Sequence, residues 1–183
     1  MSEARTIGKA EPPLDDPIVI VDYDARWPML FELEAARIRT VLGGRALQIE
    51  HTGSTSVPGL AAKPTIDLML AVADSADEAA YVPALQSDGY PLLIREPDWY
   101  EHRMFKGPDA DINLHVFSTG CPEIARVLLF RDWLRHDAGD RDRYARTKRD
   151  LARTPWRHVQ DYADAKTAVI AEIMARARGP RPE

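Results

Sequence analysis

The chain has 183 residues, 45% of them apolar, with four tryptophans and six tyrosines, which suffices for one well-cored domain and is marginal for two. The formal net charge of −5 argues against a dedicated nucleic-acid-binding protein, because such proteins usually carry a basic excess. The single cysteine, Cys121, excludes an internal disulfide and a zinc site built from several cysteines.

The first segment, residues 1–17, is rich in proline and acidic side chains and is predicted to be a disordered lead. It contains no apolar core segment and therefore does not match a signal peptide. Along the whole chain, no apolar run approaches the roughly 20 residues that span a bilayer. We therefore expect a cytoplasmic protein that does not contact membranes, with a single domain over residues 18–178.

The first half of that domain is predicted to combine short strands with two helices. Apolar residues spaced three or four apart, from Phe31 to Leu42, indicate a helix that ends at the two glycines that follow. Ser75 with Glu78 three residues later matches a capping box and predicts a second helix over residues 75–86. Apolar and alternating patterns predict strands over residues 18–21, 47–51 and 65–72.

The second half is predicted to add a strand pair and then helices. Residues 103–106 and 112–117 are expected to pair antiparallel across the turn Gly107-Pro108-Asp109. Helices are expected to begin at Pro122 and to cover residues 140–152 and 158–177. Strands that come first and helices that come last predict one α+β domain with a helical C-terminal third.

The most informative stretch contains a small-residue turn followed by a strand with one carboxylate. Gly53 and Ser54 suit a turn whose free N–H groups and hydroxyl can hold a phosphate. Asp67 lies in an otherwise apolar strand, where a lone charge is costly unless it has a partner or a metal. It can hold Mg²⁺, accept hydrogen bonds from the turn or pair with an arginine. Lys63, between turn and strand, could neutralise a bound phosphate or lie in solvent.

Two neighbouring segments offer further candidates for this site. Asn113 and His115 share one face of their predicted strand, and His115 could act as a ligand or general base or could simply be hydrogen-bonded. Glu50 and His51 point to opposite faces of theirs. Glu50 is the better candidate for a second negative charge beside a metal at Asp67, whereas His51 is expected to be buried and hydrogen-bonded.

The helical third carries basic candidates at helical spacing. Arg131 and Arg135 lie one turn apart and could clamp a phosphate or carboxylate, or form ion pairs with acids such as Asp132. Tyr144 and Lys148 likewise share one helix face. Lys166 falls in the centre of an apolar stripe, where a lysine must reach solvent, pair with a buried acid or face a ligand.

One long motif carries a family resemblance. Residues 50–67, EHTGSTSVPGLAAKPTID, resemble the signature of the GrpB family, and further similarity lies in residues 113–116, 130–135 and 166–167 and in Tyr144 with Lys148. GrpB is regarded as a branch of the DNA polymerase β-like nucleotidyltransferases, and some members are fused to dephospho-coenzyme A kinase. The resemblance implies a mixed sheet flanked by helices. It also implies that Gly53 and Ser54 match the superfamily's Gly-Ser pair and that Asp67 matches its first metal-binding carboxylate.

The chain departs from the superfamily at Met69, where a second metal-binding carboxylate is usual. A thioether is a poor ligand for Mg²⁺, so Glu50 or His115 would have to replace that carboxylate in a metal-dependent transferase. Two functions are expected. One is a nucleotidyltransferase-like protein that binds a nucleotide or other phosphorylated small molecule, with Mg²⁺, in a cleft around Gly53, Ser54 and Asp67. The alternative is a catalytically inactive module that binds a ligand or a partner, such as dephospho-coenzyme A kinase.

Overall fold

The computed structural model describes residues 17–108 and 111–179. Residues 1–16 of the predicted lead and Asp109 of the predicted turn lie outside these described residues. Within them, no helix is both long enough and apolar enough to cross a bilayer.

A five-stranded sheet forms the centre of the domain, with the spatial order β1-β2-β5-β4-β3. Its central pair, β2 and β5, is parallel, and the other neighbours are antiparallel, so the sheet is mixed as the resemblance implied. In chain order the strands are β1 (Gln48–Thr52), β2 (Ile66–Val72), β3 (Leu92–Glu96), β4 (His102–Lys106) and β5 (Ile112–Ser118).

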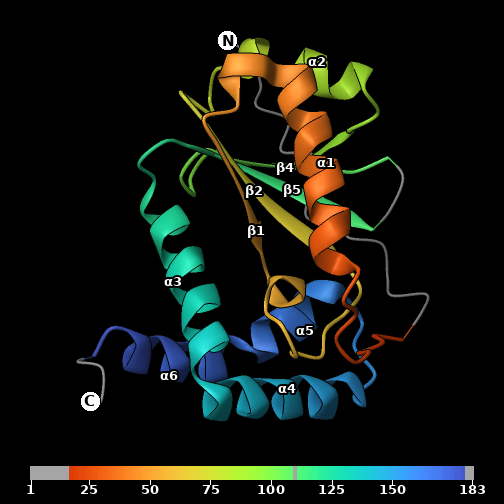
Figure 1. The fold of residues 1–183 in the computed structure, drawn as a ribbon, viewed down its shortest axis with the longest axis vertical. Helices are drawn as coiled ribbons and strands as arrows, with labels where there is room; N and C mark the ends of the chain where they lie inside the picture. The colour runs from red at the N-terminus through yellow and green to blue at the C-terminus, as the bar shows by residue number, and fades with distance from the viewer. Residues whose placement is uncertain (1–16, 109–110, 180–183) are drawn as a thin grey trace.

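Helices α1 (Trp27–Leu42) and α2 (Val82–Ser87) cover one face of this sheet (Figure 1). Alternation along β2 turns Ile66, Leu68 and Leu70 toward this face, where they are buried with the apolar stripe of α1 in the main core. The same alternation turns Asp67 and Met69 to the opposite face. The site predicted from the sequence therefore lies away from the main core.

Four C-terminal helices lie beside and below the opposite face. Helix α3 packs on Met69 and Phe117 through Ile124, and the helices after it gather at the lower end of the molecule (Figure 1). Those lower helices bury Tyr144 and Ile173 against the segment between β1 and β2. Their bounds are α3 (Pro122–His136), α4 (Ala138–Ala152), α5 (Val159–Ala165) and α6 (Thr167–Ala177). The predicted helical C-terminal third is confirmed.

The helix predicted over residues 75–86 is wrong in its first half. A one-turn helix covers Glu78–Ala80, and α2 begins only at Val82. Ser75 caps no helix, because its N–H and hydroxyl both bond the Ser118 hydroxyl, at 2.9 and 3.0 Å.

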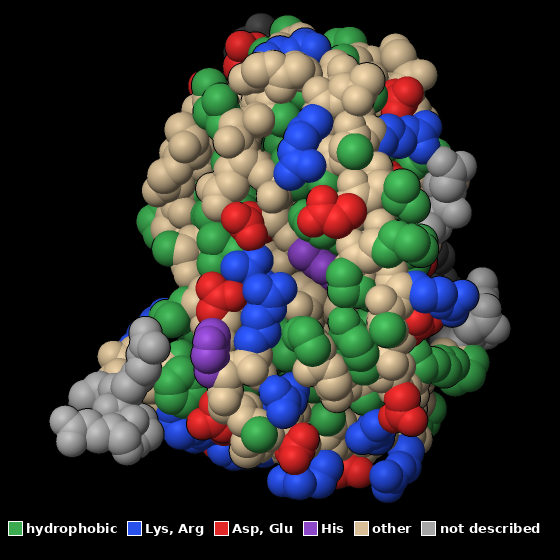
Figure 2. Space-filling model, in the orientation of Figure 1, with side chains coloured by type: hydrophobic (Ala, Val, Ile, Leu, Met, Phe, Trp, Pro, Cys, Tyr) green, Lys and Arg blue, Asp and Glu red, His purple; other side chains and the backbone are tan. Residues whose placement is uncertain are grey.

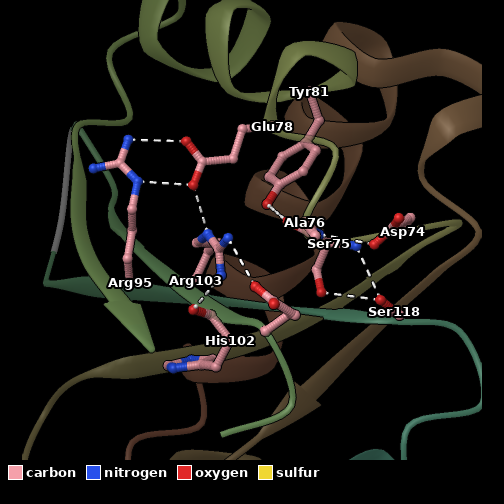
Figure 3. Close-up of polar contacts among 10 residues, drawn as sticks. Asp74, Ser75, Ala76, Glu78, Tyr81, Arg95, His102, Arg103 and Ser118 are labelled. Carbon is pink, nitrogen blue, oxygen red and sulfur yellow. Dashed lines mark hydrogen bonds and ion pairs between the residues drawn. The ribbon is translucent and has the colours of Figure 1, made fainter. Parts of the chain in front are cut away.

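Glu78 makes tertiary ion pairs instead of a capping box (Figure 3). Its Oε1 accepts from Nε of Arg95 at 2.7 Å and from Nε of Arg103 at 2.6 Å. These two arginines lower the pKa of the Glu78 carboxyl, against the effect of its partial burial. Contacts between segments distant in the sequence therefore override the local helix signal.

Three smaller differences concern strands and the last helix. The strand predicted over residues 18–21 is reduced to one bridge between Val21 and Ala62. Strand β3 was not predicted. The helix predicted over residues 158–177 is divided at Lys166, where α5 ends and α6 begins.

Candidate functional site

The turn after β1 approaches Asp67 so closely that only glycine fits. Gly53 has φ +66°, in the left-handed region, and a Cβ there would lie 2.2 Å from Oδ2 of Asp67. The one-turn helix Ser54–Ser56 follows at once, and the Ser56 hydroxyl donates to the Gly53 carbonyl at 2.6 Å. The backbone of the Gly53-Ser54 turn therefore lies directly against the strand carboxylate.

Asp67 meets the two polar side chains predicted on the neighbouring strand. In the parallel register of β2 and β5, Asp67 is opposite Asn113 and Met69 is opposite His115. Nδ2 of Asn113 donates to Oδ1 of Asp67 at 3.0 Å, and Nε2 of His115 lies 3.9 Å from the same oxygen. The three side chains thus form one polar cluster on the open side of the sheet.

Helix α4 places a buried lysine near this cluster. The Lys148 side chain is only 2% exposed, and its Nζ has no hydrogen-bond partner among residues 17–108 and 111–179. It lies 4.6 Å from the centre of the Tyr144 ring. Burial, together with the positive charges of Lys166 and Arg149, lowers the pKa of Lys148 to about 7, and the charge of Asp67 opposes this shift.

Lys166 and Lys63 bring further positive charge toward Asp67. Lys166 lies where α5 meets α6, with Nζ 4.5 Å from the centre of the Tyr162 ring. Burial lowers its pKa, the charge of Asp67 raises it, and the charge of Lys63 lowers it. One carboxylate therefore faces several ammonium groups, which leaves the site with an excess of positive charge.

Tyr144 links the lower helices to the glycine-serine turn. Burial raises the pKa of its phenol, and a side-chain hydrogen bond with Ser54 opposes that shift. Phe130 packs edge-on against its ring at 5.4 Å between ring centres. The structure thus brings one group of predicted residues together around Asp67, namely Gly53, Ser54, Lys63, Asn113, His115, Tyr144, Lys148 and Lys166.

The remaining predicted residues, Glu50, Arg131 and Arg135, bond one another, Asp132 or the backbone instead. Nη1 of Arg131 donates to Oε2 of Glu50 at 2.8 Å and to the carbonyl of His51 at 3.0 Å. Nη2 of Arg135 donates to the carbonyl of Ser56 at 2.8 Å. These bonds tie α3 to β1 and its turn. Both arginines and Glu50 line a cleft beside α1 whose lining does not include Asp67 or Lys148.

His51 is buried and hydrogen-bonded, as expected. Its Nε2 lies 3.0 Å from the Thr55 hydroxyl, and its ring stacks on Phe31. Burial lowers the pKa of His51 to about 4, and the nearby positive charges of Arg131 and Arg135 act in the same direction, so this ring is neutral at pH 7.

Sequence reasoning missed the support behind His115. Nε2 of His102 lies 3.0 Å from Nδ1 of His115, and Nδ1 of His102 lies 2.8 Å from Oε2 of Glu96. Burial lowers the pKa of His102 to about 4, assisted by His115 and opposed by Glu96. The contacts run from Glu96 on β3 through His102 on β4 to His115 on β5. They could be recognised only once the order of these strands in the sheet was known.

The surface around the site carries both signs of charge. Figure 2 shows acidic and basic side chains interspersed over the lower helices. Within the described part of the chain, no group of three or more His, Cys, Asp or Glu side chains is arranged to hold a metal ion.

The fold and these residues agree with one family. The model of the family described as GrpB protein matches residues 17–176. The chain belongs to the GrpB family. A UPF0157 protein from Halalkalibacterium halodurans is 63% identical to this GrpB chain, over 94% of the chain and 88% of the relative. A second UPF0157 protein, from Streptomyces coelicolor, is 46% identical over 90% of the chain and 86% of the relative.

Longer relatives carry an enzyme name. A protein named dephospho-CoA kinase from Mycolicibacterium paratuberculosis is 28% identical over 88% of this GrpB chain but only 46% of its own length. The match therefore covers less than half of that relative.

Solved structures confirm the fold class. The crystal structure of the conserved protein GrpB from Enterococcus faecalis superposes with a TM-score of 0.77 at 29% identity, over 87% of this chain and 96% of that one. Cid1 poly(U) polymerase with Mg 3′-dATP bound gives a TM-score of 0.54 at 11% identity, over 72% of this chain and 44% of Cid1. The likeness to Cid1 establishes a nucleotidyltransferase-like fold.

Proposed function

We propose that this GrpB protein binds a nucleotide or another phosphorylated small molecule at the site formed by Gly53, Ser54, Asp67, Lys148 and Lys166. The observation that carries the proposal is the Lys148 ammonium, which is 2% exposed and has no hydrogen-bond partner in the described structure. A buried ammonium without a partner is costly, so its retention needs a reason. An anionic oxygen at this point would supply the missing acceptor.

The geometry around Lys148 suits phosphate in particular. A second lysine, Lys166, adds positive charge, and the Ser54 hydroxyl and the backbone of the turn offer further donors. Asp67 alone would not balance these lysines. A phosphate chain carries enough negative charge to do so, and Cid1 of similar fold has been solved with Mg 3′-dATP bound.

Metal-dependent nucleotidyl transfer requires a cation at Asp67, and the residues fit Mg²⁺ poorly. Mg²⁺ prefers an octahedron of oxygen ligands. The position two residues beyond Asp67 is occupied by Met69, which is 1% exposed and packed in the core under α3. Glu50, the other candidate for a second acid, bonds Arg131. We therefore place binding in this proposal and derive no catalytic step from Mg²⁺.

Met69 also favours the second candidate function, a module that binds its ligand without turning it over. Such a module could serve a partner enzyme, and the longer relatives named dephospho-CoA kinase make that enzyme the partner to test. The two functions share the anion site and differ in turnover. Incubation with nucleoside triphosphates and divalent metals, followed by product analysis, distinguishes them.

The test of binding compares the wild type with two neighbouring charge variants. We would measure thermal stability and calorimetric binding with ATP, UTP and dephospho-coenzyme A, each in EDTA and with divalent metal. A ligand at about 100 times its Kd stabilises the fold by about 2.7 kcal/mol. Lys148→Met should abolish that gain. Arg146→Met removes an exposed charge from the same helix and should keep it. Equal ligand stabilisation of wild type and Lys148→Met would refute the proposed site.

A further inference from the structure

We propose that the cleft between α1 and α3 binds a free α-amino acid with an aliphatic side chain, whose carboxylate bonds Arg135 and whose ammonium bonds His51 and Glu50. The cleft has a volume of about 240 Å³. Pockets for drug-sized ligands usually measure about 300–1,000 Å³, so this cleft suits a smaller molecule. It lies apart from the phosphate site proposed above, because its lining does not include Asp67 or Lys148.

The cleft crosses the outer edge of the sheet, where β1 is the edge strand. On one face of β1, Phe31 of α1 stacks on the ring of His51, with 4.8 Å between ring centres. On the other face, Arg131 of α3 bonds Glu50. Figure 2 shows side chains of both charges and a histidine gathered on this surface, between the positions of α1 and α3 in Figure 1. Two side chains that point to opposite faces of β1 therefore line one cleft.

Arg135 presents an anion-binding edge to the cleft. Its Nε and Nη2 both donate to the Ser56 carbonyl, at 3.1 and 2.8 Å. Its Nη1 lies 3.5 Å from Oδ1 of Asp132, and that oxygen already accepts from Nε of Arg131 at 2.7 Å. A guanidinium has five N–H donors, so Nη1 and the outer N–H of Nη2 remain for the two oxygens of a carboxylate.

His51 presents an acceptor to the same cleft. The Thr55 hydroxyl gives its one hydrogen to the Thr65 carbonyl, so it must accept from Nε2–H of His51 at 3.0 Å. Because this ring is neutral at pH 7, its Nδ1 carries a lone pair, which has no partner among the described residues. In that part of the chain, only Lys148 and Tyr162 have unpartnered side-chain atoms sealed from the surface. Nδ1 of His51 is therefore accessible to a donor.

The acids of the cleft favour a ligand without net charge. Arg131 is paired with both Glu50 and Asp132, at 2.8 and 2.7 Å. Glu32 adds a third carboxylate to the surroundings of the cleft. These acids repel a ligand of net negative charge, such as phosphate, whereas an α-amino acid carries one charge of each sign.

An α-amino acid satisfies the donors and acceptors together. Its carboxylate meets the free edge of Arg135, while its ammonium donates to Nδ1 of His51 and to the Glu50 carboxylate, which has lone pairs beyond those used by its present donors. Pro28, Phe31 and Pro58 add apolar lining against which an aliphatic side chain can pack.

The first experiment varies the ligand and keeps the wild-type protein. Calorimetry in a buffer free of phosphate compares L-leucine with leucinamide, which lacks the carboxylate, and with N-acetyl-leucine, which lacks the ammonium. Each loss removes charged hydrogen bonds and should weaken binding at least about 10-fold. If leucine, valine and methionine all fail to bind at millimolar concentration, or if N-acetyl-leucine binds as well as leucine, the proposal is wrong.

The second experiment reads the His51 ring by long-range ¹H–¹⁵N NMR. We expect the Nε2–H tautomer in the ligand-free protein and a shift of the Nδ1 signal when leucine is added. A proton on Nδ1 without ligand, or an Nδ1 signal that leucine does not move, would overturn the contact with His51 and with it the proposal.

The third experiment uses variants to separate this cleft from the phosphate site. Arg135→Lys keeps the charge but loses the forked edge and should weaken leucine binding at least about 10-fold. Arg39→Lys, at an exposed position of α1 outside the cleft lining, is the matched control and should bind as wild type does. Lys148→Met should bind leucine normally even where it has lost ATP. Loss of leucine binding in Lys148→Met, or displacement of leucine by ATP, would place leucine at the phosphate site and refute the proposal, whatever the outcome for phosphate binding.

Discussion

Replacement of the buried lysine by methionine should make the ligand-free protein more stable. Lys148→Met keeps most of the aliphatic stem and removes an ammonium that is shielded from water without a hydrogen-bond partner in the described structure. A residue that costs stability is typical of a binding site. The prediction therefore tests the physical basis of the proposed function without any ligand.

The size of the effect follows from the pKa. Each pH unit between folded and unfolded pKa values corresponds to about 1.4 kcal/mol. Burial lowers the pKa of Lys148 from its ordinary value of 10.5 to about 7, which corresponds to a penalty of roughly 5 kcal/mol for the charged form. Loss of the attraction between Lys148 and the Tyr144 ring returns about 1–2 kcal/mol. We expect a net gain of about 3–4 kcal/mol near pH 7.

The stability advantage of Lys148→Met should depend on pH, and the direction follows from the lowered pKa of Lys148. Between about pH 7 and 10.5 the unfolded chain holds a proton on Lys148 that the folded protein has lost, so wild-type stability rises with pH in this interval. Below about pH 7 both states are protonated and the full penalty applies. The advantage of Lys148→Met should therefore be largest at pH 6.5 and shrink by pH 9.5.

Urea unfolding at both pH values, in a buffer free of phosphate, measures this difference directly. Arg146→Met serves as the control, since its exposed charge on the same helix should give a small difference that does not change with pH. If the stability difference between Lys148→Met and wild type stays constant from pH 6.5 to 9.5, burial of the ammonium is not the source of the stability penalty.

Three further variants test the framework of the site. Gly53→Ala should cost at least about 2 kcal/mol in thermal unfolding, because φ is positive and the new Cβ meets Asp67; Gly44→Ala, whose Cβ meets open space in the described structure, should change stability little. Arg131→Ala should cost about 1–3 kcal/mol in urea unfolding, because it leaves a carboxylate and a carbonyl of β1 without their donor; an unchanged midpoint would contradict this. Glu78→Gln should destabilise at pH 7, and its effect should fade below about pH 4.5, because the lowered pKa means that the ion pairs stabilise only where the wild-type carboxylate is ionised; an equal loss at pH 3 would contradict it.

The sequence predicts those elements whose signal is local. Strands β1, β2 and β5 follow from alternation and apolar runs, and α1, α3 and α4 follow from helical periodicity with proline or glycine at the ends. Strand β3 gives a weaker signal because Pro91 and Pro97 flank it and its register shifts between Leu92 and Ile94. The capping box at Ser75 failed because arginines from β3 and β4 bind its glutamate.

The same division between local and tertiary information holds for the site. Residues that share a strand face, such as Asn113 and His115, could be grouped from their spacing alone. Their closeness to Asp67 required the parallel pairing of β2 with β5. Spacing placed Lys148 on the same helix face as Tyr144, but the burial of Lys148 beside the exposed Arg149 depends on the packing of α4 over the turn. His102 and Glu96 needed the full strand order.

Met69 shows how packing and chemistry are coupled at this sheet face. In a site with two carboxylates, the second acid would occupy this position, solvated and facing a metal. Here α3 packs over Met69 together with Ala71 and Phe117, so a carboxylate would lose its water without gaining a partner. The register places His115 directly opposite Met69 on the adjacent strand. Glu50 is directly opposite Met69 on β1 but bonds Arg131, so the imidazole of His115 is the polar group beside this position that faces Asp67.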